Sequence, residues 1–242
     1  MKLIIPLFIF NIVFAADFFH KVEIDEKDKI NSVELRSGKK GDNRYYEGKI
    51  KRKFKTTLSN LKDAIMAFDQ RCNNEYIEKR ELVSKKDKCK YHNGNVIENF
   101  IHKELKEYKK DENEIDRIMI SRRIYNREEF SQTDIVKVYK YTQDDKEVIK
   151  ITMEMLKEKD AKNFIKPKVK TNSAFNKAYG LFLLTELSKK EVELEYTYSS
   201  RTDHWLINKS IAAGEVFESM AGSLNNLFDN LAKESTELMA KN

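Results

Sequence analysis

The chain has 242 residues, enough for one domain and at most a small appendage. Hydrophobic residues make up 40% of it and aromatic residues 11%, which suffices for a packed core and excludes a chain that is disordered throughout. Its 46 basic and 40 acidic residues nearly cancel and are interleaved along the chain, so the net charge of +6 argues against a dedicated nucleic-acid binder.

The first 15 residues differ from the rest, because a single lysine precedes an apolar run that ends in small residues. This pattern predicts a secretory signal peptide over residues 1–15, cleaved before Ala16 or Asp17. An apolar run of about 12 residues is too short to cross a bilayer. We therefore expect an exported protein, either periplasmic or secreted.

Residues 16–42 are polar and predict a loosely packed N-terminal arm, which leaves residues 43–242 as the main domain. The domain opens with YYEGKIKRKF, whose alternation predicts a half-buried strand with one face made of Tyr46, Gly48, Ile50, Arg52 and Phe54. The period then changes to that of a helix capped by Thr56 or Thr57. Its apolar face consists of Leu58, Leu61, Ile65, Phe68 and Cys72.

The sequence contains two cysteines, Cys72 and Cys89. In an oxidising compartment they can form one disulfide, which is the interpretation we favour. The alternatives are two buried free thiols or half of a metal site. Only His92 follows the pair closely, and the spacing of zinc ligands is absent.

Residues 96 to about 199 predict strands joined by short turns. Three hairpins are expected, with turns at KDEN, QDD and SKK. The inward faces of the later strands are predicted to carry Ile149, Ile151, Met153, Met155, Val192, Leu194, Tyr196 and Tyr198.

A long amphipathic helix is predicted after the last strand. Its apolar stripe, about 20 residues or about 30 Å long, consists of Ala213, Phe217, Met220, Leu224, Leu227, Phe228 and Leu231. The strands have one apolar face that needs covering. We therefore predict an α+β fold in which a curved antiparallel sheet wraps around the C-terminal helix.

Two stretches resemble a known family. ISRRIYNREEF, with Arg127 and Glu128, is similar to a strand-turn-strand segment of the START lipid-transfer domain. The stretch from YGLFLLTEL to the last helix, with Trp205, Leu206 and Asn208, resembles that family's closing hairpin and helix entry. The resemblance covers roughly residues 43–234 and extends to the wider helix-grip superfamily, also called the polyketide-cyclase/START or SRPBCC group.

The resemblance implies a hydrophobic ligand, a lipid or sterol-like molecule, enclosed beneath the C-terminal helix by a carrier or sensor. The candidate lining residues are Met153, Met155, Phe182, Tyr196, Phe217, Met220 and Leu224. Close packing of these side chains with no space between them is the alternative. Methionine suits a pocket that adapts to its ligand.

Arg122 is a further candidate, because it shares the parity of three isoleucines on its predicted strand. A charge on an apolar face needs a partner. Arg122 is therefore a candidate to bind the phosphate or carboxylate of an amphipathic ligand. The alternatives are an internal glutamate partner or a solvated strand end.

No nucleophile motif occurs, and the four histidines are scattered, so no catalytic residue is assigned and the expected function is not enzymatic. We expect no cofactor, no nucleic-acid partner, a monomer, and at most transient contact with a membrane surface. An enzyme of the cyclase or hydrolase type on the same fold, and an interaction module with a filled core, are the alternatives.

Overall fold

The computed structural model describes residues 18–26, 29–72, 89–92, 96–104, 115–125, 131–161, 175–204 and 210–240. In chain order, its elements are β1 (Phe18–Glu26), β2 (Lys29–Lys40), β3 (Asn43–Phe54), α1 (Leu58–Met66), a 3-10 turn (Phe68–Gln70), β4 (Arg71–Cys72), β5 (Tyr91–His92), β6 (Val96–Glu104), β7 (Ile115–Tyr125), β8 (Ser131–Gln143), β9 (Lys146–Met155), α3 (Glu158–Ala161), β10 (Lys177–Ser188), β11 (Glu191–Thr202) and α4 (Ser210–Met239).

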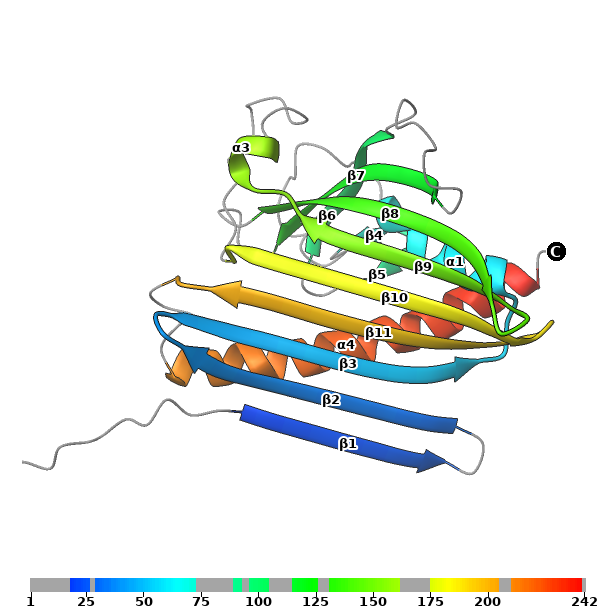
Figure 1. Cartoon of the computed structure of the whole chain (residues 1–242), viewed down its shortest axis with the longest axis horizontal. Coiled ribbons are helices and arrows are strands. Elements are labelled where there is room, and N and C mark those ends of the chain that lie inside the picture. The colour runs from blue at the N-terminus through cyan, green and yellow to red at the C-terminus, as the bar shows by residue number, and fades with distance from the viewer. Residues whose placement is uncertain are drawn as a thin grey trace, which may run out of the picture.

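Nine strands within these ranges form one sheet, in the order β1-β2-β3-β11-β10-β9-β8-β7-β6. Every neighbouring pair is antiparallel (Figure 1). β3 and β11 are far apart in the sequence, and β11 pairs with β3 along residues Arg44 to Phe54 of β3. The two-residue strands β4 and β5 make a separate parallel pair.

The predicted N-terminal arm is wrong. β1 and β2 extend the sheet within residues 16–42, and β2 pairs with β3 from Ser32 to Lys40. Leu35 on β2 is completely buried and belongs to the core. This stretch is polar in composition, but Leu35 is an inward apolar residue among its described side chains. One such residue is enough for β2 to pair with β3 and to cover part of the core.

The three predicted hairpins are confirmed as antiparallel pairs β6–β7, β8–β9 and β10–β11. Asp144 and Asp145 form the turn between β8 and β9, with φ of 48° and 59°. Both central residues of a tight type I′ hairpin turn need positive φ, and aspartate tolerates this conformation better than most residues.

Helix α1 begins at the predicted cap, where the Thr57 hydroxyl accepts a hydrogen bond from the Asn60 N–H at 3.2 Å. It ends at Met66, six residues before the predicted end at Cys72. Arg71 explains the early end, because its guanidinium donates to the carbonyl groups of the last turn of the helix: those of Ala64, Ile65 and Ala67.

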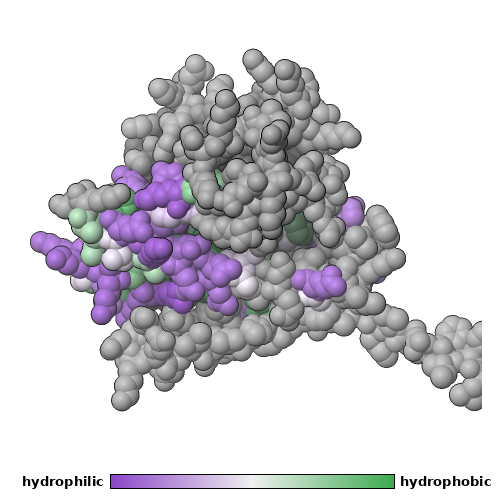
Figure 2. Space-filling view, turned by 180° about the vertical axis from the view of Figure 1, so that it is seen from behind, coloured by the Kyte–Doolittle hydropathy of each residue, from purple (hydrophilic) through white to green (hydrophobic). Residues whose placement is uncertain are grey.

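Helix α4 crosses the concave side of the sheet (Figure 1). It has 30 residues and is therefore about 45 Å long, half as long again as the predicted stripe. Leu224, Phe228 and Leu231 are buried against the sheet. Described side chains that reach the surface on this side of the molecule are mostly hydrophilic (Figure 2). The predicted α+β helix-grip fold is confirmed.

Helix α4 packs closely against β3 at Gly48. A Cβ atom there would lie 2.7 Å from Leu35 Cδ2, 3.2 Å from Leu224 Cδ1 and 3.4 Å from Met220 Cε. The missing side chain therefore makes room for two residues of the helix and one of β2. Close approach of this kind is one reason for glycine inside a strand.

We expect Gly48→Val to destabilise the protein by about 1–3 kcal/mol, because the added methyl groups overpack the contact between β3 and α4. The matched control is Gly222→Ala, at an exposed position of α4 with nothing within 4 Å of a Cβ. It should stabilise the helix by about 0.5–1 kcal/mol. Urea unfolding of the three proteins measures both effects, and equal stabilities for Gly48→Val and wild type would contradict the proposed close contact.

Candidate functional site

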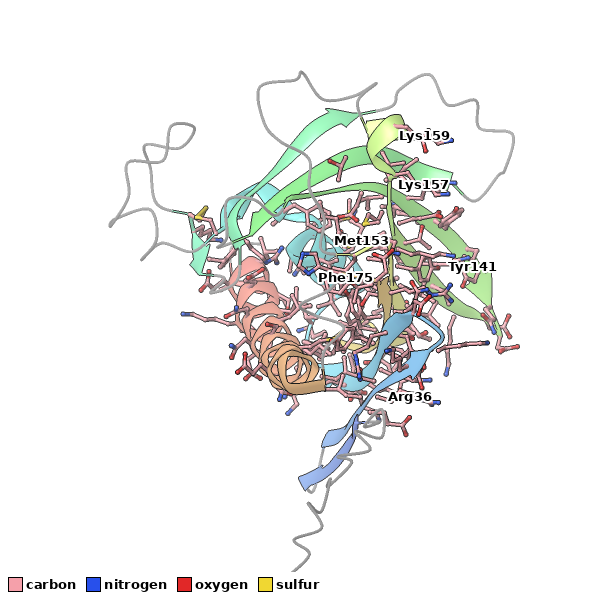
Figure 3. All side chains as sticks on the ribbon, turned by 90° about the vertical axis from the view of Figure 1, so that its left-hand side faces the viewer. Arg36, Tyr141, Met153, Lys157, Lys159 and Phe175 are labelled. Carbon is pink, nitrogen blue, oxygen red and sulfur yellow. A yellow bond between two sulfur atoms is a disulfide. The ribbon has the colours of Figure 1, made fainter. Side chains whose placement is uncertain are left out.

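Five of the predicted lining residues come together between the sheet and α4. Met153, Phe182, Tyr196 and Leu224 are buried, and the half-buried Met220 packs against the same core. Met153 lies inside the curve of the sheet (Figure 3). These residues come from β9, β10, β11 and α4, so the sheet and the helix both contribute to one apolar surface.

An aromatic stack lies at the centre of this surface. Phe182 and Tyr196 are opposite each other on β10 and β11, with ring centroids 4.2 Å apart and planes inclined by 28°. Gly180 leaves room for the stack, because a Cβ atom there would lie 3.2 Å from Tyr196 Oη. Stacked rings bury a large apolar area with few rotatable bonds.

The other predicted residues are not part of this cluster as described. Met155 is half-buried at the end of β9, opposite Asp134 of β8. The side chains of Phe217 and Arg122 lie outside the described residues, as do Trp205 and the Arg127–Glu128 segment. Their roles stay predictions.

In the backbone pairing of β7 with β8, Arg122 is opposite Thr133.

Sequence reasoning missed Phe175, which packs against the apolar core. Phe175, just before β10, meets Tyr46 of β3 edge to face, with centroids 6.3 Å apart and planes at 89°. Phe175 lies inside the curve of the sheet, as Met153 does (Figure 3). No periodic pattern marks an aromatic residue that precedes a strand, so the sequence carried no signal for it.

Buried polar residues gather at one end of the same surface, where β3 begins and β11 ends. Arg44 and Thr202 are opposite each other and completely buried, and Ser37 and Ser200 are 1% and 5% exposed. Burial raises the pKa of Tyr46 to about 12, and the positive charge of Arg44 offsets part of this rise. Arg44 therefore lies within electrostatic reach of the Tyr46 phenol.

A second polar pair lies on β8, at the same end of the sheet. Gln132 Nε2 donates to Asp134 Oδ1 at 2.6 Å, and both side chains are buried. The strands β9, β10 and β11 separate this pair from β3.

The C-terminal half of α4 is held by a buried ion pair. Arg71 of β4 donates to the carboxylate of Glu234, and the two side chains are 6% and 0% exposed. Glu234 Oε1 has no hydrogen-bond partner. Burial raises the pKa of the Glu234 carboxyl, while the charge of Arg71 lowers it by a smaller amount.

Further contacts fasten this end of the helix. Arg52 Nη1 donates to Asp229 Oδ1 at 2.7 Å, and the Thr56 hydroxyl donates to the carbonyl oxygen of Ser235 at 3.3 Å. Phe54 and Phe228 pack with centroids 5.9 Å apart. The C-terminal half of α4 is thus tied to β3 and to the chain that follows it.

A disulfide joins Cys72 to Cys89, with Cα atoms 5.7 Å apart. The predicted pairing is therefore present, and the alternatives of free thiols and a metal half-site do not apply. Cys72 directly follows Arg71, so the disulfide lies beside the ion pair that holds α4.

Within the described ranges, no group of three or more histidine, cysteine or acidic side chains could hold a metal ion. No helix in that part of the chain is both long and apolar enough to cross a membrane.

Comparison with known proteins gave matches only among solved structures. No protein-family model matches the chain, and no curated protein matches its sequence. Human STARD10 shares 12% identity with it, with a TM-score of 0.47, over 89% of this chain and 73% of that one. A STAR-related lipid transfer protein from Xanthomonas axonopodis shares 13% identity, with a TM-score of 0.48, over 88% and 98%.

A START superfamily protein from Mycobacterium smegmatis is also similar, at 12% identity and a TM-score of 0.43, over 79% of this chain and 98% of that one. These proteins belong to the family that the sequence motifs resemble. The strand order of the sheet and the helix α4 define the fold of this chain.

We expect Glu234→Ala to destabilise the protein by about 3–5 kcal/mol, because it leaves the buried Arg71 guanidinium without its carboxylate. The control is Glu237→Ala on the same helix, whose carboxylate lies 3.6 Å from Lys90 and is 39% exposed. That change should cost less than about 1 kcal/mol. Chemical denaturation measures both values, and similar costs for the two variants would contradict an anchoring role for Arg71 and Glu234.

The raised pKa of Glu234 predicts a pH dependence of stability. The folded protein holds this proton more tightly than the unfolded chain, where the pKa is near 4.5. The contribution of Glu234 is therefore complete below that pH and decreases as the pH rises through the raised value. The melting temperatures of wild type and Glu234→Gln should be compared from about pH 4 to pH 8. As the pH rises, the melting temperature of wild type should fall relative to that of the variant. A rise in the relative melting temperature of wild type would mean that the attraction of Arg71 for the Glu234 carboxylate outweighs the effect of burial.

Proposed function

We propose that this protein binds a hydrophobic ligand, a lipid or sterol-like molecule, between the sheet and α4, as a non-enzymatic carrier or sensor. One observation carries the proposal. The apolar surface beneath α4 continues, along β3 and β11, into a group of buried polar residues at the end of the sheet. Such a gradient suits an amphipathic ligand, because apolar walls with a few placed polar groups are typical of ligand sites.

The side chains beneath the helix also fit this role. Met153 and Met220 are unbranched and polarisable, so they can adjust to ligands of different shape. The Phe182–Tyr196 stack gives a flat wall against which rings or acyl chains can pack. Phe217 and Met155 are further candidate lining residues.

The attachment of α4 supports a gate. Its C-terminal half is tied by Arg71, Arg52 and Thr56, whereas Met220 and Leu224 of its earlier turns meet the sheet at Gly48 through apolar contacts. A helix hinged near its C-terminal half would let a ligand enter beside the earlier turns. Hinge motions of this kind are common ways to open a site.

We also propose that the protein is exported, as the pattern of residues 1–15 predicts. A disulfide supports this location, because disulfides persist mainly in oxidising compartments. A monomer that contacts membrane surfaces transiently would be consistent with ligand exchange. N-terminal sequencing of the protein from its source should give Ala16 or Asp17 as the first residue, and retention of Met1 would contradict export by cleavage.

Ligand binding can be tested by purifying the protein, extracting it with organic solvent and analysing the extract by mass spectrometry. We expect a lipid in up to one copy per protein, and uptake of a fluorescent lipid by the stripped protein. Absence of both would contradict the proposed function.

A filled core and an open site are distinguished by Met153→Trp. In an open site, the larger ring occupies ligand space, so lipid uptake should decrease at least about tenfold, which corresponds to 1.4 kcal/mol of binding energy, while the melting temperature changes little. In a filled core, the same change should cost about 1–3 kcal/mol of stability.

The matched control is Tyr141→Trp, on the outer side of the same sheet (Figure 3), which should leave uptake unchanged. Loss of stability in Met153→Trp without any lipid uptake by wild type would favour the interaction module.

A further inference from the structure

Two buried hydroxyl groups at the polar end of the sheet have no partner. Ser37 on β2 and Ser200 on β11 are both opposite Tyr46 of β3, so they lie on either side of it in one row. They are 1% and 5% exposed, and neither Oγ atom has a hydrogen-bond partner.

Leaving a buried hydroxyl group without a hydrogen bond is costly, and native proteins rarely do so. Two such groups in the same row indicate that something polar binds there. A hydroxyl can donate as well as accept, so the charges nearby decide what chemistry fits.

The buried charge there is positive. Arg44 lies two residues before Tyr46 on the same face of β3 and is completely buried. The register places Lys39 of β2 on one side of it and Thr202 of β11 on the other. A guanidinium beside hydroxyl donors matches the oxygen atoms of a phosphate or carboxylate, because charge-assisted hydrogen bonds are the strong ones.

We infer that Ser37, Ser200 and Arg44 form a subsite for an anionic oxygen group, a phosphate or carboxylate, at the end of the sheet where β3 begins. The inference rests on the proposed function in one respect: the group is the head of the ligand whose apolar part lies beneath α4.

The experiment compares three probes on the full-length protein. Phosphatidic acid and diacylglycerol with the same acyl chains differ only in the phosphate, and inorganic phosphate lacks the chains. We expect phosphatidic acid to bind at least about tenfold more tightly than diacylglycerol. Binding of inorganic phosphate with equal affinity would instead assign the subsite to a free anion.

The double variant Ser37→Ala, Ser200→Ala should weaken phosphatidic acid binding about tenfold and change diacylglycerol binding less than about twofold. Ser199→Ala is the matched control, because Ser199 is the neighbouring serine and points to the other face of β11, opposite Glu47. It should leave both affinities unchanged. Arg44→Lys keeps the positive charge but loses the planar guanidinium group, which can bind two oxygen atoms at once. This change should therefore weaken phosphatidic acid binding by several fold.

The outcomes separate the two proposals. Equal binding of both lipids by wild type, with no effect of the double variant and no phosphate binding, would overturn the anion subsite and leave the proposed function standing. In that case, trapped water satisfies the serines. Binding of phosphate that depends on the serines, without uptake of either lipid, would support the subsite and overturn the proposed function.

Discussion

The concave face of the sheet is apolar and has to be kept from water, and the rest of the structure depends on how α4 does this. Leu224, Phe228 and Leu231 bury one side of the helix against the sheet. Apolar contact has no direction, so it does not fix where along the sheet the helix lies. Hydrogen bonds fix this position, and two buried ones join Arg71 to Glu234 and Thr56 to Ser235. A buried ion pair of this kind is better explained by the specific position it imposes than by net stability.

Much of the architecture could be predicted from the sequence, because period-2 and period-3.6 patterns report directly on sheets and helices. The three hairpins, the cap at Thr57 and the closing helix follow from such patterns. The strands β1 and β2 could not be predicted in this way, because the polar composition of residues 16–42 suggested an arm. A strand that exposes one face to water needs few apolar residues. The early end of α1 depended on Arg71, a tertiary contact that no local pattern encodes.

The site could be predicted in its apolar part and not in its polar part. Met153, Phe182 and Tyr196 were found because burial follows strand parity. The same parity places Arg44 on the inward face two residues before Tyr46, and helical spacing places Glu234 in the stripe three residues after Leu231. Both signals were present, but a charged residue is normally assigned to the surface.

The pairing of β3 with β11 has a consequence for the order of folding. The middle of the sheet joins residues 44–54 to residues 192–202. During synthesis, β1, β2 and β3 can form only part of a sheet until β11 has been made, and α4 follows β11. Contacts so distant in sequence slow folding and lengthen the time for which partial sheets expose their edges. Exposed edges of this kind favour aggregation and chaperone binding in general, and here the edge of β3 stays open until β11 has been made.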